Sequence, residues 1–400
     1  MAYSPSNFSF MTRKLVDKKI GLVLSGGGAR AAYQVGVLKA ICRLMPADSK
    51  NPFQVISGTS AGAINAVALA SYAGHYKLGI RSLENIWKNF SSDQIYRTDI
   101  KGVLGSSIKF FLNTFFGYKA GDPVSLLDNS PLRGLLKKVV LYENIQKAID
   151  NKDLHAISVT ASGYASGESV SFFQAHNSIK NWQRLRRIGL RSRINVEHLL
   201  ASSAIPSVFP AIQINREFFG DGAIRQLAPI SPALHLGAEK VLVIGVSGEA
   251  HKRKQRETMK SYPSMAKIMN HMFNAAFLDS MESDVERLTR INSTLSKIPE
   301  EIMVSEGINL KPVDILEISP SESIDDIAAR HARELPKSLR FFLKGSGTTH
   351  KSGAGVLSYL LFERGFCRDL IQHGYDDAMK RKDDILKFFC EETETAATKK

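Results

Sequence analysis

Short, uninterrupted apolar runs that end at glycine characterise the first part of the chain. Lys19–Ser25 and Phe53–Ser57 are such runs, and each leads through a glycine-rich turn into a segment with helical spacing, Ala31–Arg43 and Ala63–Tyr72 respectively. A continuous apolar run is typical of a strand that is buried on both faces, as in a parallel sheet. Two successive strand–turn–helix units therefore predict an α/β fold with a mainly parallel central sheet.

Further along the chain, the pattern predicts more strands and then mostly helices. His155–Ala161 and Ser169–Phe173 alternate as strands do, and the turn Ala165–Glu168 joins them. Lys240–Val246 and Val313–Ile318 are further buried strands. From Ser264 onward helical spacing dominates, and Asp369–Phe389 is predicted as a charged helix. We expect four parts: a polar leader at 1–18, an α/β domain at 19–250, a mainly helical part packed on it at 251–390, and a disordered tail at 391–400.

Composition and charge narrow the class of protein. The 400 residues are 44% hydrophobic and 23% charged, as in ordinary globular proteins. Three dispersed cysteines, Cys42, Cys367 and Cys390, argue against a disulfide framework or a structural zinc site. The sequence shows neither a signal peptide nor a membrane-spanning run, so we expect a cytoplasmic or peripheral membrane protein. Secretion without a cleaved signal is also compatible with the sequence. The net charge of +14 suits anionic membranes, whereas no nucleic-acid-binding motif is present.

A nucleophile elbow is the first chemical motif. Gly58-Thr59-Ser60-Ala61-Gly62 matches G-x-S-x-G and lies between a predicted buried strand and a small-residue helix. This chemistry needs a serine at a strained strand-to-helix turn, with glycines where the strand and helix nearly touch. The alternative is a serine that only caps the helix. We interpret Ser60 as a nucleophile, with Gly58 and Gly62 supporting the turn.

A glycine-rich loop after the first strand is the second motif. Gly26-Gly27-Gly28-Ala29-Arg30 lets backbone N–H groups converge into an anion-binding nest. Beside Ser60, the N–H groups of these residues and of Ala61 would form an oxyanion hole. The same letters also fit the dinucleotide fingerprint of a nucleotide-binding oxidoreductase, but the next strand ends in the serine elbow instead of an acidic residue.

Together these motifs resemble those of the patatin-like phospholipases. That family carries a GGGxRG-type oxyanion loop, a G-x-S-x-G elbow and a distant Asp-Gly-Ala/Gly, which occurs here as Asp221-Gly222-Ala223. The resemblance covers residues 19–250 and extends more weakly through 314–320 and 355–378. One departure is Ala31, where the family usually has glycine.

The resemblance implies a three-layer α/β/α patatin-like fold with a helical C-terminal extension, and a lipid acyl hydrolase of phospholipase A or lysophospholipase type. It implies Ser60 as nucleophile and Asp221 as its base, supported by Arg30 and Gly222, with no metal or other cofactor. From the residues alone, a histidine such as His235 could still complete a Ser–Asp–His triad. A non-catalytic, lipid-binding member of the fold stays a further alternative.

Two segments are candidates for contact with a phospholipid or other acyl-ester lipid in a membrane surface. Residues 102–116 form a broad apolar face, which suits a lid, an interfacial helix or a core-facing helix. Five arginines between Arg184 and Arg193 could bind lipid phosphates, although a solvated helix face is the simpler interpretation. Arg30 could bind phosphate or brace the glycine loop.

Overall fold

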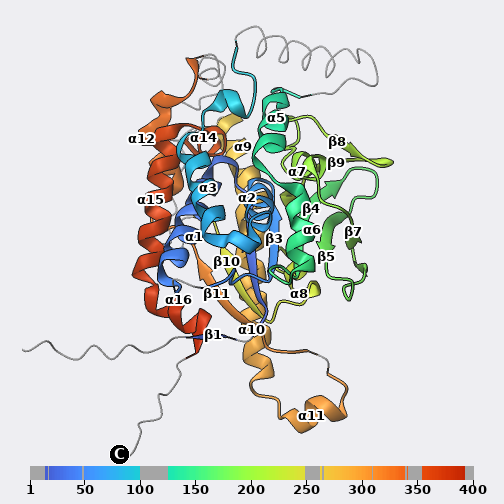
Figure 1. The fold of residues 1–400 in the computed structure, drawn as a ribbon. Helices are drawn as coiled ribbons and strands as arrows, with labels where there is room; N and C mark the ends of the chain where they lie inside the picture. The colour runs from blue at the N-terminus through green and yellow to red at the C-terminus, as the bar shows by residue number, and fades with distance from the viewer. Residues whose placement is uncertain are drawn as a thin grey trace, which may run out of the picture.

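The computed structural model describes residues 14–16, 18–46, 49–99, 125–247, 262, 263, 265–308, 310–337, 340 and 354–391. Within them, a 10-stranded sheet forms the centre of the molecule (Figure 1). Eight strands follow one another in the order β11-β10-β2-β3-β4-β5-β7-β6. The other two lie off this path: β9 pairs with β4 and also with β8. The first five strands of this path are parallel, as predicted, whereas β5 is antiparallel to β4.

The strands of this sheet are short, and β2 and β10 at its centre are almost continuously apolar. Their bounds are β2 Ile20–Leu24, β3 Val55–Thr59, β4 Ala156–Gly163, β5 Ser169–Ala175, β6 Trp182–Arg184, β7 Arg187–Arg191, β8 Ile212–Ile214, β9 Glu217–Asp221, β10 Lys240–Ile244 and β11 Asp314–Ile318. A separate two-stranded sheet joins β1 (Lys14–Leu15) to β12 (Cys390–Glu391), so the two ends of the described chain meet.

Helices cover both faces of the sheet, which confirms the predicted three layers. Along β2, Leu22 and Leu24 face one hydrophobic core, shared with α1 and α15, whereas Val23 faces a second core, shared with α8 and α10. This alternation explains why the strand is apolar at every position. The helices of the first part are α1 Ala32–Leu44, α2 Ala61–Ala70, α3 Tyr76–Lys88, α5 Ser130–Val139, α6 Tyr142–Asp150, α7 Val196–Ser202 and α8 Ser231–His235.

The C-terminal part is mainly helical, as predicted, but it also adds β11 to the edge of the central sheet. Its helices are α9 Met265–Asn274, α10 Ser280–Leu295, α11 Glu300–Ser305, α12 Ile324–His331, α14 Ala354–Leu360, α15 Arg364–Lys380 and α16 Lys382–Phe389. The charged helix predicted at Asp369–Phe389 is therefore two helices separated at Arg381. The boundary expected at residue 250 stays a prediction.

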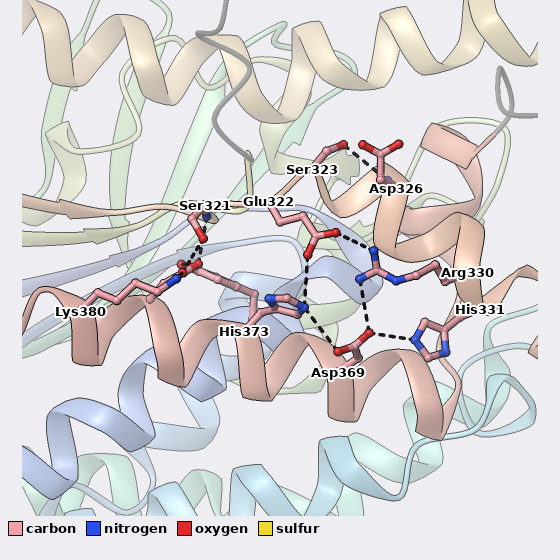
Figure 2. A network of polar contacts seen from close by, with 11 residues as sticks. Ser321, Glu322, Ser323, Asp326, Arg330, His331, Asp369, His373 and Lys380 are labelled. Atoms are coloured by element: carbon pink, nitrogen blue, oxygen red, sulfur yellow. Dashed lines mark hydrogen bonds and ion pairs between the residues drawn. The ribbon is translucent and has the colours of Figure 1, made fainter.

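A polar network holds α12 against α15 (Figure 2). Asp369 of α15 accepts a hydrogen bond from His331 Nε2 at 3.0 Å and pairs with Arg330 of α12. Glu322, just before α12, contacts both Arg330 and His373. These ion pairs and hydrogen bonds between their charged groups hold α12 and α15 together.

The arginine-rich segment corrects one expectation. Arg184–Arg193 is not a solvated helix face, because Trp182–Arg184 and Arg187–Arg191 form the antiparallel pair β6–β7. Trp182 lies over Gly189, where the missing side chain leaves room for the indole, and β7 also pairs with β5. Cross-strand packing therefore overrides the local charge pattern.

Three other expectations fall wholly or largely outside the described residues. The apolar segment 102–116 lies outside them. Of the expected leader, residues 14–16 and 18 are described, and Lys14 and Leu15 form β1. Of the expected tail, only Glu391 is described, as the end of β12.

Candidate active site

Ser60 occupies a sharp turn between β3 and α2. Its backbone has φ 55° and ψ −130°, a conformation that a residue with a side chain adopts only under strain. Two hydrogen bonds maintain this conformation: Ser60 O accepts one from Ala63 N at 2.9 Å and one from Ile64 N at 3.4 Å. The residue is 2% exposed. Ser60 therefore lies at the junction between strand β3 and helix α2, as the G-x-S-x-G pattern predicts.

The glycines of this turn are required by close packing. A Cβ on Gly62 would lie 2.4 Å from the carbonyl oxygens of both Leu24 and Ser25 at the end of β2. A Cβ on Gly58 would lie 2.6 Å from Ala63 Cα. Such approaches are too short for any side chain, so glycine at these two positions lets α2 start directly against the sheet.

Asp221 is the last residue of β9, and its side chain contacts Ser60. β9 pairs antiparallel with β4, and in this register Asp221 lies opposite Ala161. Its Oδ2 atom accepts a hydrogen bond of 2.6 Å from Ser60 Oγ, and Oδ1 accepts one of 2.9 Å from Ala223 N. A Cβ on Gly222 would lie 2.0 Å from Thr160 O, so glycine is needed there for the approach to β4.

Complete burial changes the chemistry of this carboxyl group. Asp221 is 0% exposed, and the loss of hydration raises its pKa from 3.8 to about 7. The hydrogen bonds from Ser60 and Ala223 oppose that rise because they favour the charged form. A carboxylate with a pKa near neutrality accepts a proton more readily than an ordinary aspartate does, which suits a general base.

The glycine loop lies directly beside Ser60. A Cβ on Gly26 would be 3.1 Å from Ser60 Cβ, and Gly28 lines a cavity together with Ser60 and Ala61. Gly28 and Ala61 are the first residues of their helices, so their N–H groups have no partner within those helices. The other two predicted loop residues are buried beside them: Gly27 packs on Val246, and Ala29 is inaccessible.

The cavity beside Ser60 is almost entirely apolar. Its volume is about 50 Å³, and Ser60 and Ala61 line part of it. The apolar lining side chains come from α2, α3, α5, α14 and the segments near them: Ile64, Ala68, Leu83, Ile86, Trp87, Phe90, Ile95, Leu132, Leu135, Leu136, Val139, Val140, Ile205, Phe209, Tyr359 and Phe362. Such a lining suits a hydrocarbon chain and leaves few polar groups to hydrogen bond a sugar or a base.

Arg30 connects the glycine loop to the C-terminal helices. Its guanidinium is 3% exposed; Nη2 donates to Asp325 Oδ1 of α12 at 2.6 Å, and Nε donates to Ser358 Oγ of α14 at 2.8 Å. It also stacks on the Tyr359 ring at 4.0 Å. These contacts favour the bracing role over phosphate binding, because the donors already have partners.

Within the described residues, no histidine hydrogen bonds to Ser60 or Asp221. His235 stacks on Trp182, and His198 hydrogen bonds to Asn195 while its ring packs on Phe172. Burial lowers the pKa of His198 to about 4, which suits a neutral structural side chain. No cluster of three or more His, Cys, Asp or Glu residues in this part of the chain could hold a metal ion.

Ser202 is a site residue that the sequence analysis missed. Its Oγ accepts a hydrogen bond of 2.8 Å from Ser60 N and donates one of 2.6 Å to Thr160 O of β4. It thereby anchors the strained backbone of Ser60 to the neighbouring strand. The segment Ser202-Ser203-Ala204-Ile205-Pro206 resembles the one that precedes the aspartate in the patatin-like phospholipases, but the role of Ser202 follows only from the tertiary structure.

Replacing Ser202 with alanine should leave the buried N–H of Ser60 unpaired. We expect a loss of about 1–3 kcal/mol in the free energy of unfolding, and about a tenfold loss in kcat for an ester substrate. Ser71→Ala is the matched control, because Ser71 Oγ donates to Ala68 O at the far end of α2 without contacting Ser60. Chemical denaturation and steady-state kinetics measure both effects; equal kcat for the two variants would contradict the anchoring role.

A strained serine turn, a buried carboxylate that accepts a hydrogen bond from the serine hydroxyl and an adjoining glycine loop therefore meet beside the α/β sheet. A sequence model of the family described as "Patatin-like phospholipase" matches residues 22–234, which is more than half of the chain. The chain therefore belongs to the patatin-like phospholipase family, as its motifs predicted.

Individual relatives match shorter regions. The chain is 36% identical over 98 residues to "Lysophospholipase nte1" of Aspergillus terreus, covering 23% of this chain and 6% of that protein. It is 27% identical over 214 residues to "cGAMP-activated phospholipase" of Pseudomonas aeruginosa, covering 54% and 55% of the two chains. It thus spans only part of the length of these relatives. The crystal structure of VipD from Legionella pneumophila aligns with 92% of this chain and 68% of its own, with a TM-score of 0.38 and 14% identity.

Proposed function

We propose that the protein is a lipid acyl hydrolase of phospholipase A or lysophospholipase type that acts through a Ser60–Asp221 dyad. The observation that carries this proposal is the hydrogen bond of 2.6 Å between Ser60 Oγ and Asp221 Oδ2, beside an apolar cavity. A serine and a base within hydrogen-bond reach are the signature of an activated nucleophile. The apolar cavity supports a fatty-acyl group as the part of the substrate that is bound.

In the proposed mechanism, Asp221 accepts the Ser60 proton as Oγ attacks the acyl carbonyl carbon. The N–H groups of Ala61 and the glycine loop stabilise the negative charge on the carbonyl oxygen. The tetrahedral intermediate collapses, the alcohol leaves with the proton held by Asp221, and an acyl-enzyme remains. Asp221 then takes a proton from water as the water oxygen attacks the acyl-enzyme carbonyl carbon. Collapse of this second tetrahedral intermediate breaks the bond to Ser60 Oγ, which takes the proton back from Asp221, and releases the fatty acid.

The two alternative functions from the sequence have less support. A dinucleotide site needs an acidic residue at the end of the next strand to bind the ribose, whereas β3 ends at Thr59 and leads directly into Ser60. A non-catalytic lipid-binding role would not require a strained serine held against a buried carboxylate, and such strain is usually retained for function.

Replacing Ser60 with alanine is expected to abolish hydrolysis while leaving lipid binding in place. With a panel of phospholipids, lysophospholipids and glycerides, fatty-acid release should fall by more than about 10³-fold, because no group is left to form the acyl-enzyme. The head group and acyl position that the wild type cleaves fastest would define its substrate. Equal release by the wild type and Ser60→Ala would refute the proposal, whereas binding without release by both would favour the non-catalytic alternative.

A further inference from the structure

Three surface turns meet at the end of the sheet that carries Ser60. β3 and β4 are parallel, so the turn at 164–168 after β4 lies at the end where β3 leads into Ser60. β5 and β7 are parallel to each other and start at this same end, which places the turn at 185–186 beside it. A hydrogen bond of 2.9 Å from Ser169 N to Arg186 O joins the two turns. The β8–β9 hairpin completes the group (Figure 1).

Large apolar side chains on these turns are exposed to solvent. Leu185 is 89% exposed at the tip of β6–β7, Tyr164 is 56% exposed after β4, and Phe218 is 52% exposed on β9. In the segment after Asp221, Ile224 lines a cavity together with Tyr164 and is 43% exposed, and Leu227, three residues further along, is 69% exposed. A cluster of this kind at one end of a protein marks an interaction surface, because exposed large apolar residues are normally scattered.

Three exposed arginines lie on the same turns as these side chains, together with the partly exposed Glu168. Arg186, Arg216 and Arg225 are exposed, and none of them has an ion-pair partner among the described residues. The carboxylate of Glu217 is already bound within the surface, since its Oε1 atom accepts hydrogen bonds from Ala165 N and Ser166 N at 3.0 and 2.7 Å. The surface therefore combines exposed hydrocarbon with unpaired guanidinium groups, the combination that binds anionic lipid interfaces.

This surface directly adjoins the candidate active site. A cavity of about 130 Å³ opens beside Asp221 and is lined by Tyr164, Gly220, Ile224 and Arg225. Partial burial raises the pKa of Tyr164, and the negative charge of the nearby Asp221 carboxylate raises it further. A lipid bilayer resting on these turns would therefore lie next to the Ser60–Asp221 pair.

We propose that Tyr164, Leu185, Arg186, Arg216, Phe218, Ile224, Arg225 and Leu227 form a docking face for an anionic lipid bilayer. The apolar side chains enter the acyl boundary, while the arginines bind lipid phosphates. The net charge of +14 adds long-range attraction to the same surface. The inference that docking presents substrate to the active site rests on the proposed function. Binding of the bilayer to this face does not depend on that function.

The test is flotation of the full chain with vesicles of phosphatidylcholine and phosphatidylglycerol. The triple variant Leu185→Ser/Arg186→Gln/Arg216→Gln changes only turn tips away from the dyad. Removing two arginines alone should weaken binding by about 30-fold, and loss of the leucine adds to that. Vesicles of phosphatidylcholine alone should bind the wild type much more weakly. Thermal unfolding verifies that the variant is folded.

A matched control removes the same charge and another strongly exposed apolar side chain at the opposite end of the sheet. Val304 is 76% exposed on α11, and Lys297 and Lys311 are exposed near it, where the chain leads into the amino end of β11. Val304→Ser/Lys297→Gln/Lys311→Gln should float like the wild type. Equal loss in both triple variants, or no flotation of the wild type, would overturn the docking face. If the wild type hydrolyses no ester but only the first variant loses flotation, docking stands and the proposed function fails.

Discussion

Replacing Asp221 with asparagine is expected to remove ester hydrolysis and, at the same time, to stabilise the fold above neutral pH. Asparagine has the same shape and can still accept from Ala223 N, but it cannot take the Ser60 proton. Loss of the general base should lower kcat by about 10²–10⁴-fold. Activity and stability are thus expected to change in opposite directions at one residue.

The stability effect takes its sign from the raised pKa of Asp221. Burial brings this pKa to about 7 in the folded protein, against an ordinary value of 3.8. Below pH 4 the group is neutral in both states and imposes no penalty. Between pH 4 and 7 the unfolded state ionises first, so the wild type loses stability as pH rises, and above pH 7 the loss is complete. A tenfold difference in proton affinity between the folded and unfolded states corresponds to about 1.4 kcal/mol, so the whole effect amounts to a few kcal/mol.

Chemical denaturation of the wild type and Asp221→Asn at a series of pH values measures this effect. The free energy of unfolding should be similar for both proteins near pH 4, and the variant should become increasingly more stable up to about pH 7. A variant that is less stable than the wild type at pH 8, or that retains full activity, would contradict the placement of a buried carboxylate on Ser60.

Replacing Gly28 with alanine is the second large expected effect. Gly28 has φ +56°, and an added Cβ would lie 2.2 Å from Tyr359 O of α14. Alanine would therefore impose both backbone strain and a clash that displaces the glycine loop from Ser60. Since loss of one oxyanion-hole donor typically costs 10²–10³ in kcat, we expect a fall of about 10²-fold or more.

Gly134→Ala is the matched control for this substitution. Gly134 lies within α5, and a Cβ there would meet no atom within 4 Å. Alanine in a helix is favoured over glycine by about 1 kcal/mol, so this variant should be as active as the wild type and slightly more stable. Steady-state hydrolysis of a soluble ester compares the two. Equal kcat for Gly28→Ala and Gly134→Ala would show that the loop does not stabilise the reaction.

The local parts of the site could be predicted from the sequence, because each depends on neighbouring residues. A buried strand, a glycine-flanked serine and a small-residue helix are contiguous at Ser60, and the same holds for the loop from Gly26 to Arg30. Their strained turns require particular residues at particular spacings. The approach of Asp221 to Ser60 could be expected only from the family resemblance, since the two positions are 161 residues apart in sequence number.

What the sequence could not indicate depends on contacts between distant segments. Asp325 and Ser358 hold Arg30, and Ser202 holds the backbone of Ser60, yet no sequence pattern assigns these roles to them. Arg184–Arg193 does not form the expected helix face, because pairing of β7 with β5 fixes an extended conformation. Long-range pairing of this kind leaves little local signal.

Covalent labelling tests the central claim most directly. The full chain is treated with an alkyl fluorophosphonate, and intact mass and peptide mapping then locate the adduct. We predict a single phosphonyl group on Ser60, formed far more slowly in Asp221→Asn and not formed on residue 60 in Ser60→Ala. Labelling at another residue, or no labelling of a folded wild type that nonetheless hydrolyses lipid, would show that Ser60 and Asp221 do not form the reactive pair.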